Sequence, residues 1–199
     1  MVPVDPSCHA GDRGNRVGER RLLQMQLPRR RVARRVADYV ARKEFDRATI
    51  AVAESRPFER IEGISYLRGA AYVENPDAPE LDTMALDALP FASEVYARDL
   101  DYRKYNSPYC QYPYVSLYTG RGCPAHCTFC LWPQVTTGHA YRTRSVANVL
   151  DECAGLRRRF PDLRELFFDD DTFTADPRRA CEIARGLGRL GICWSTNAR

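Results

Sequence analysis

The 199-residue sequence contains no run of about 20 apolar residues, which is the length that a helix needs to cross a bilayer. Its N-terminus also lacks the apolar core of a secretory signal, so we expect a cytoplasmic protein. Any contact that it makes with a membrane would be peripheral. Disulfides are rare in that compartment, so the eight cysteines do not predict a disulfide framework.

The arginine-rich stretch at residues 20–35 contains no aromatic residue. Residues 1–47 hold 12 Lys and Arg against 6 Asp and Glu, whereas the rest of the chain holds 18 against 20. Clustered arginines can bind phosphates, but without interleaved aromatics or a recognised nucleic-acid module we do not favour nucleic acid as a partner. Residues 1–35 are therefore expected to form a poorly ordered, arginine-rich leader.

The pattern changes after the leader. Residues 36–54 repeat apolar residues at spacings of three and four, which predicts an amphipathic helix, and residues 63–76 alternate as in a short hairpin. Residues 76–101 are acidic and contain several prolines without a sustained period, which predicts a linker. We expect a small α/β piece at 36–75, this linker, and a second region at 102–199.

The second region alternates between strands and helices. Residues 112–118, 163–171 and 191–199 are typical of strands, and two helices are predicted between them, one capped by Ser145 and one by Asp176. A spacing of roughly 30 residues predicts a parallel sheet with right-handed crossovers. Chemically active residues in such folds gather at the carboxyl ends of the strands.

A short cysteine-rich stretch follows the first of these strands. "RGCPAHCTFCLWPQ", residues 121–134, contains Cys123, Cys127 and Cys130. A structural zinc site needs a fourth ligand, and no second close pair of ligands is present. The nearest candidates for that ligand are Cys110, His126 and His139.

An iron–sulfur cluster uses three thiolates differently. A 4Fe–4S cluster ordinarily takes four thiolates, so three from one loop leave one iron open to a small molecule. The glycines and prolines around the cysteines favour a tight loop, and Phe129 could shield the cluster from water. The zinc site stays open as the alternative, as a module without catalytic activity that contacts nucleic acid.

The spacing Cys-x3-Cys-x-aromatic-Cys after a strand resembles the radical S-adenosylmethionine superfamily. The resemblance implies that Cys123, Cys127 and Cys130 bind a 4Fe–4S cluster and that Phe129 packs near the cofactor. It also implies that the open iron holds S-adenosylmethionine, which the reduced cluster cleaves to start radical chemistry. The implied fold is a partial (β/α) barrel preceded by the tail of a Rossmann-like cobalamin-binding domain.

A second family feature is altered in this sequence. Members usually carry a Gly-Gly-Glu-like turn after the second strand, where this chain has "FFDDDTFT". The pattern is similar to an aspartate variant in the branch with an N-terminal cobalamin-binding domain, so Asp170 and Asp171 are candidate cofactor contacts. Asn197 and Arg199, after the third strand, are further candidates. The resemblance assigns no catalytic residue.

Residues beyond the cysteines narrow the resemblance further. Residues 127–152 are most similar to radical enzymes of hopanoid biosynthesis that form the cyclitol ether head group. That similarity implies a lipid-linked sugar or other small molecule as substrate, flavodoxin or ferredoxin as reductant, and cobalamin in the full-length protein. A radical methyltransferase or methylthiotransferase acting on another substrate is the alternative. Three strand–helix units are too few for a closed barrel, so we expect a fragment.

Overall fold

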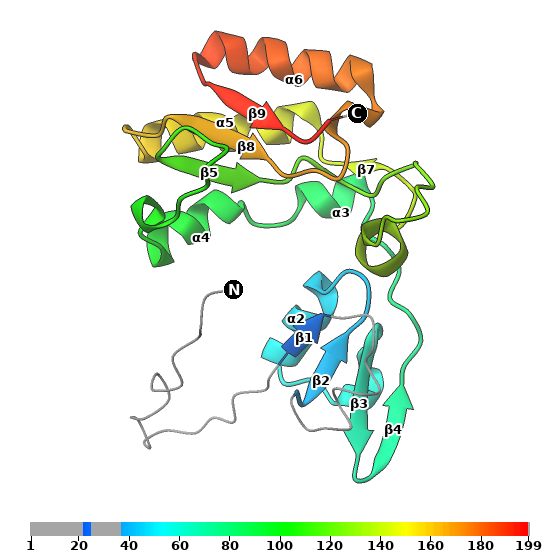
Figure 1. The fold of residues 1–199 in the computed structure, drawn as a ribbon. Coiled ribbons are helices and arrows are strands. Elements are labelled where there is room, and N and C mark those ends of the chain that lie inside the picture. Colours follow the sequence, from blue (N-terminus) through cyan, green and yellow to red (C-terminus); the bar gives the residue numbers. More distant parts are fainter. Residues whose placement is uncertain (1–21, 25–36, 199) are drawn as a thin grey trace.

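The computed structural model describes residues 22–24 and 37–198, which form two larger sheets with a helical connection between them (Figure 1). The predicted leader, residues 1–35, lies outside the described residues except for the strand β1 (Leu22–Gln24). None of the helices in the described ranges has the length and apolar character that crossing a bilayer requires.

Residues 37–76, here called the N-terminal unit, form a four-stranded sheet together with β1. The strand order is β1-β2-β3-β4, with β2 at Tyr39–Ala41, β3 at Ile64–Arg68 and β4 at Ala71–Glu74. β1 pairs with β2 in parallel, and the other pairs are antiparallel. The predicted hairpin is therefore confirmed as β3–β4, and Gly69 supplies the positive φ of 65° in its turn.

The predicted helix over residues 36–54 is wrong in its first half. Helix α2 covers Asp46–Ala53, while the residues before it form β2. Val40 and Ala41 have exposed fractions of 0% because β2 lies between β1 and β3. Lys43 has a positive φ of 54°, which a helix cannot continue through. The apolar spacing thus came from a strand that is buried along its whole length.

The predicted linker at residues 76–101 contains two short helices, α3 (Thr83–Asp87) and α4 (Ala92–Asp99). The Asp82 side chain caps α3 by accepting a hydrogen bond from the Ala85 amide at 2.8 Å. The connection is therefore folded rather than extended. Helices of five and eight residues are too short to show a sustained period in the sequence.

The C-terminal region has the predicted alternation of strands and helices. Strands β5 (Tyr114–Leu117), β8 (Glu165–Phe168) and β9 (Trp194–Thr196) form a parallel sheet in that order. Helices α5 (Val146–Arg159) and α6 (Pro177–Leu190) connect them. The short helical turns are η2 (Phe58–Arg60), η3 (Tyr102–Lys104), η4 (Pro133–Thr137) and η5 (Phe173–Ala175).

Local sequence signals set the ends of both connecting helices. The Ser145 side chain accepts a hydrogen bond from the Asn148 amide at 3.2 Å, which begins α5. Asp176 accepts from two amides in the first turn of α6, and Pro177 occupies the first helical position. α6 ends at Gly191, whose φ of 62° is left-handed.

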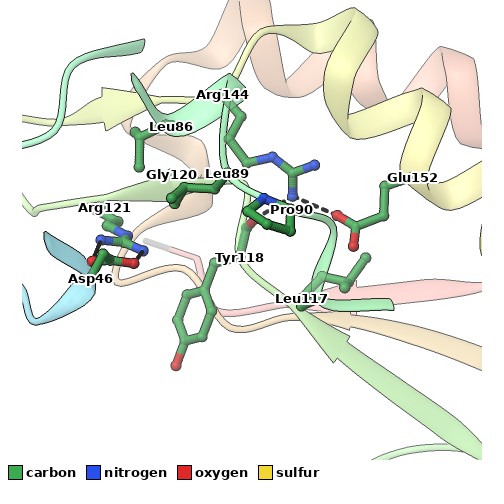
Figure 2. Close-up of a pocket in the computed structure, with 11 residues that line it drawn as sticks. Asp46, Leu86, Leu89, Pro90, Leu117, Tyr118, Gly120, Arg121, Arg144 and Glu152 are labelled. Atoms are coloured by element: carbon green, nitrogen blue, oxygen red, sulfur yellow. Dashed lines mark hydrogen bonds and ion pairs between the residues drawn. The ribbon is translucent and has the colours of Figure 1, made fainter. Parts of the chain in front are cut away.

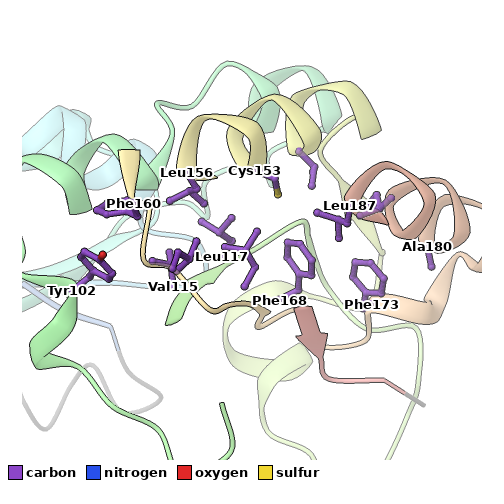
Figure 3. Close-up of a cluster of buried hydrophobic side chains, with 14 residues drawn as sticks. Tyr102, Val115, Leu117, Cys153, Leu156, Phe160, Phe168, Phe173, Ala180 and Leu187 are labelled. Carbon is purple, nitrogen blue, oxygen red and sulfur yellow. The ribbon is translucent and has the colours of Figure 1, made fainter. Parts of the chain in front are cut away.

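One hydrophobic core joins the parallel sheet to α5 and α6 (Figure 3). The alternate strand residues Val115, Leu117 and Phe168 are almost completely buried. They pack in one cluster with Leu156 of α5 and Leu187 of α6. The carboxyl ends of β5, β8 and β9 consequently lie at one edge of the sheet, where the cysteine-rich stretch also lies (Figure 1).

Candidate functional site

The cysteine loop, residues 122–141, is closed by a two-stranded antiparallel ribbon that we call the neck. The neck consists of β6 (Gly120–Arg121) and β7 (Arg142–Thr143). Gly122 follows β6 with a φ of 90°, and a Cβ at this position would lie 2.1 Å from the Ala140 carbonyl oxygen. Glycine is thus required where the two ends of the loop approach each other.

The three cysteines of the loop differ in exposure. Cys123 is buried, and its sulfur lies 3.1 Å from the Thr172 hydroxyl oxygen. Cys127 and Cys130 are half-buried, and the Cys130 amide donates to the Cys127 carbonyl at 3.1 Å. The structure thus places all three thiols on one loop at the carboxyl end of the sheet.

The donor set suits an iron–sulfur cluster. Every cysteine in the described part of the chain is a free thiol. Within that part, no three side chains of Cys, His, Asp or Glu converge closely enough to hold a metal ion. The three thiols have the number, the spacing and the loop that a cluster takes.

The alternative fourth ligands for zinc are not arranged as ligands. The rings of His126 and His139 stack with their centroids 4.1 Å apart. His139 Nδ1 lies 3.1 Å from the Cys123 carbonyl oxygen, so this nitrogen already has a backbone partner. Cys110 is also outside any three-residue donor cluster in the described ranges. A closed zinc site requires four ligands, whereas the loop supplies three thiols, which is the number that leaves one iron of a 4Fe–4S cluster open.

Asp169 connects the ends of all three parallel strands. Its Oδ2 accepts a hydrogen bond from the Tyr118 hydroxyl at 3.1 Å, and its Oδ1 accepts from Asn197 Nδ2 at 3.0 Å. Tyr118, Asp169 and Asn197 directly follow β5, β8 and β9. Burial, with the charge and hydrogen bond of Asp169, raises the pKa of Tyr118 to about 12. The phenol therefore acts as a donor at neutral pH.

Asp170 is turned into the protein. Its exposed fraction is 0%, and it accepts hydrogen bonds from the Thr119 amide and the Thr119 hydroxyl, each at 2.6 Å. Burial raises the pKa of the Asp170 carboxyl, although these bonds and the charge of Arg179 act in the opposite direction. Asp170 thus fixes the residue immediately before the neck.

Arg179 of α6 also stabilises the neck. Its Nη2 donates to the carbonyl oxygens of Thr119 at 2.7 Å and Arg144 at 2.9 Å. These two carbonyls lie on either side of the neck, and the Arg144 amide also donates to Thr119 at 3.0 Å. Arg179 is buried, and its guanidinium group donates to these backbone carbonyls rather than to solvent.

Asp171 faces the cysteine loop. Its Oδ2 accepts a hydrogen bond from the Thr137 hydroxyl at 2.7 Å, and the adjacent Thr172 hydroxyl contacts Cys123. Of the two predicted aspartates, Asp171 therefore lies against the loop, whereas Asp170 binds Thr119 just before the neck.

The predicted residues Phe129 and Asn197 are exposed, and so is Trp132, which lies beside Phe129 in the sequence. Phe129 has an exposed fraction of 90%, and Trp132 one of 61%, so neither packs on the loop in this structure. Asn197 is exposed beside Asp169, and Arg199 lies outside the described residues. Gln134 Nε2 donates to the Cys130 carbonyl at 3.0 Å.

A cavity of about 260 Å³ lies beside the neck (Figure 2). Its wall is mainly apolar, from Leu86, Leu89 and the end of β5. The charged side chains in the wall pair with each other, Arg121 with Asp46 and Arg144 with Glu152, each with a contact of 2.7 Å. The cavity therefore offers no uncompensated charge to a ligand.

Sequence analysis missed several residues of this site, and the reasons differ. Tyr118 and Asp169 directly follow strands, so their position at strand ends was a usable signal. Arg179 lies inside a helix, and Glu44 lies in a segment that was predicted to be helical. Their contacts join residues far apart in the chain, which a local pattern cannot reveal.

No family model matches the chain. A cytidylyl-2-hydroxyethylphosphonate methyltransferase of Streptomyces wedmorensis is 37% identical over 119 residues, which is 56% of this chain and 21% of that protein. An uncharacterised methyltransferase of Pyrococcus horikoshii is 29% identical over 152 residues, which is 75% of this chain and 31% of that protein.

Two solved structures of TsrM, a radical S-adenosylmethionine methyltransferase from Kitasatospora setae, have a similar fold. Their TM-scores are 0.52 and 0.53 at 17% and 18% identity, and the match covers 80% of this chain. One contains tryptophan and an S-adenosylmethionine analogue, and the other contains cobalamin and a [4Fe-4S] cluster. The likeness confirms the predicted α/β fold class. The chain spans 30% and 31% of those two proteins.

Proposed function

We propose that this chain is the cluster-binding part of a radical S-adenosylmethionine methyltransferase of the cobalamin-binding branch. The observation that carries the proposal is the cysteine loop. Three free thiols, spaced by three residues and then by two, lie on one glycine-hinged loop at the carboxyl end of the first parallel strand. The similar fold of TsrM and the two curated methyltransferases support the same class of reaction.

Cys123, Cys127 and Cys130 would hold three irons of a 4Fe–4S cluster. When bound, this cluster supplies an electron and an open iron for S-adenosylmethionine. Asp171 lies against the cysteine loop and is the candidate for a polar contact to that cofactor. Asp170 and Arg179 are positioning residues, because their hydrogen bonds fix the neck from which the loop extends.

Tyr118, Asp169 and Asn197 form a polar row across the carboxyl edge of the sheet. The Asp169 carboxylate holds both neighbours in place, so the Tyr118 phenol and the Asn197 amide keep a fixed orientation. Such a row can orient a polar small molecule above the sheet. We assign these side chains to substrate or cofactor orientation.

Methyl transfer is favoured over hopanoid head-group formation. Both curated relatives are named as methyltransferases, and the structural neighbour is a methyltransferase that contains tryptophan. We therefore propose a small molecule as methyl acceptor, cobalamin as a further cofactor of the whole protein, and a flavodoxin or ferredoxin as the electron source. These proposals place the protein in the cytoplasm, where such reductants work.

Metal content tests the proposal directly. After anaerobic reconstitution with iron and sulfide, we expect about four irons and four sulfides per chain. Cys127→Ala should lose most of both, whereas Cys181→Ala on the exposed surface of α6 should retain them. A chain that binds one zinc ion and no sulfide would contradict the proposal.

A further inference from the structure

The neck of the cysteine loop carries two arginines that face each other. Arg121 of β6 and Arg142 of β7 are partners in the antiparallel register. Like charges directly opposite each other destabilise a strand pair, so this neck needs nearby carboxylates.

Two of the three carboxylates that pair with these arginines come from the N-terminal unit. The third, Glu80 of the connection, lies 3.3 Å from Arg142 Nε and is more exposed. Asp46 binds Arg121 in a bidentate manner, with contacts of 2.7 and 3.0 Å (Figure 2). Glu44 lies 2.8 Å from Arg142 Nη1 and 3.5 Å from Arg121 Nη1, so it serves both guanidinium groups. Its second oxygen accepts a hydrogen bond from the Leu81 amide at 3.0 Å.

Arg142 also contacts the cysteine loop directly. Its Nη2 donates to the Thr137 carbonyl at 2.6 Å, and the neighbouring Gly138 carbonyl accepts from the Cys123 amide at 3.2 Å. Arg142 Nη1 also donates to the Leu81 carbonyl at 2.9 Å, which secures the connection between the two regions. A continuous set of contacts therefore runs from Glu44 to the first cysteine.

The pairs are shielded from solvent. The exposed fractions of the Glu44 and Arg142 side chains are 9% and 12%. Removing one partner from such a pair leaves a poorly solvated charge, which is far more disruptive than breaking a surface pair. The contacts can therefore determine the conformation of the neck.

We propose that Glu44 is a positioning residue for the cysteine loop. Its ion pairs with Arg142 and Arg121 attach the neck to the N-terminal unit, keep the neck closed and keep Cys123 buried. The inference goes beyond the proposed function, because it concerns the conformation of the chain before any cluster is bound. A failure to bind iron would leave it intact.

Alkylation of the metal-free, reduced chain tests this inference. Mass spectrometry measures the modification rate of each cysteine, and the ratio of the Cys123 rate to the Cys153 rate is the quantity of interest. Cys153 reports on global unfolding, because it is completely buried in the core. Exposed Cys181 corrects for the intrinsic reactivity of the reagent.

Glu44→Gln should raise the ratio about tenfold or more, because the neck opens locally while the core stays folded. Asp46→Asn should raise it in the same direction. Glu59→Gln is the matched control: it removes a carboxylate of the same unit whose partner, Arg68, is on the surface. An unchanged ratio in Glu44→Gln would overturn the inference, and this includes the case in which the Cys123 and Cys153 rates rise together.

Discussion

Both oxygens of the Asp170 carboxylate are bound by Thr119, one by its backbone amide and one by its hydroxyl, each at 2.6 Å. This relationship joins the end of β8 to the residue before the neck. A carboxylate predicted to face the cofactor thus forms part of the base of the loop.

Asp170→Ala should lower the free energy of unfolding by about 3 kcal/mol, because it removes two charge-assisted hydrogen bonds and leaves the Thr119 amide buried without a partner. It also removes a carboxylate whose charge interacts with the buried Arg179. Urea denaturation measures the change. Asp151→Ala on the exposed face of α5 is the control and should change stability by less than about 0.5 kcal/mol. Equal effects of the two variants on stability would show that the hydrogen bonds between Asp170 and Thr119 do not stabilise the fold.

Gly122→Ala should destabilise the chain by about 2 kcal/mol or more, because the added Cβ meets the Ala140 carbonyl oxygen and φ is 90°. Gly188→Ala in α6 is the matched control, since no atom lies within 4 Å of its added Cβ. That control should be neutral or stabilising by up to about 1 kcal/mol. Thermal unfolding measures the stability of both variants. An unchanged stability in Gly122→Ala would contradict the close approach of the two ends of the loop.

The Asp46–Arg121 pair should make stability depend on pH in the acid range. Burial alone would raise the pKa of Asp46, but the hydrogen bonds and charge of Arg121 hold it below the ordinary 3.8. A carboxyl with a lowered pKa stabilises the fold fully above its unfolded pKa, and this stabilisation is lost as the pH falls through the folded pKa.

The unfolding free energy of the parent protein should therefore fall more steeply than that of Asp46→Asn between about pH 5 and pH 2. Urea denaturation at stepped pH measures both slopes. Parallel slopes would mean that Asp46 is not held ionised by Arg121.

Asp171→Asn should weaken S-adenosylmethionine binding to the reconstituted protein about tenfold, the effect of one hydrogen bond to a charged group. Its iron content should stay at the parental level, because Asp171 contacts Thr137 and is not a thiol ligand. Equilibrium dialysis measures the affinity. Asp162→Asn, at a surface pair with Arg103, provides the control. If Asp171→Asn binds S-adenosylmethionine with the parental affinity, Asp171 does not contact this cofactor.

Much of the C-terminal fold could be predicted from local signals. Ser145, Asp176 and Pro177 marked the starts of α5 and α6, and β-rich runs such as residues 112–118 marked the strands. The N-terminal prediction failed at β2, because a central strand is buried on both faces and its apolar run also fits a helix.

The site was predictable only in part. The spacing of the three cysteines is a local pattern, so the loop could be recognised from the sequence, and the role of its thiols as cluster ligands stays a prediction. The direction in which adjacent aspartates point is set by tertiary contacts: Asp170 turns to Thr119, whereas Asp169 turns to Tyr118. The contacts of Glu44 with the neck are equally non-local, since they join two separate sheets.

The most direct test of the central claim is electron paramagnetic resonance of the anaerobically reconstituted, dithionite-reduced protein, recorded with and without S-adenosylmethionine. The account predicts a cluster signal that shifts when S-adenosylmethionine is added and that disappears in Cys127→Ala. A cluster signal that is identical with and without S-adenosylmethionine would contradict an iron left open by the three cysteines.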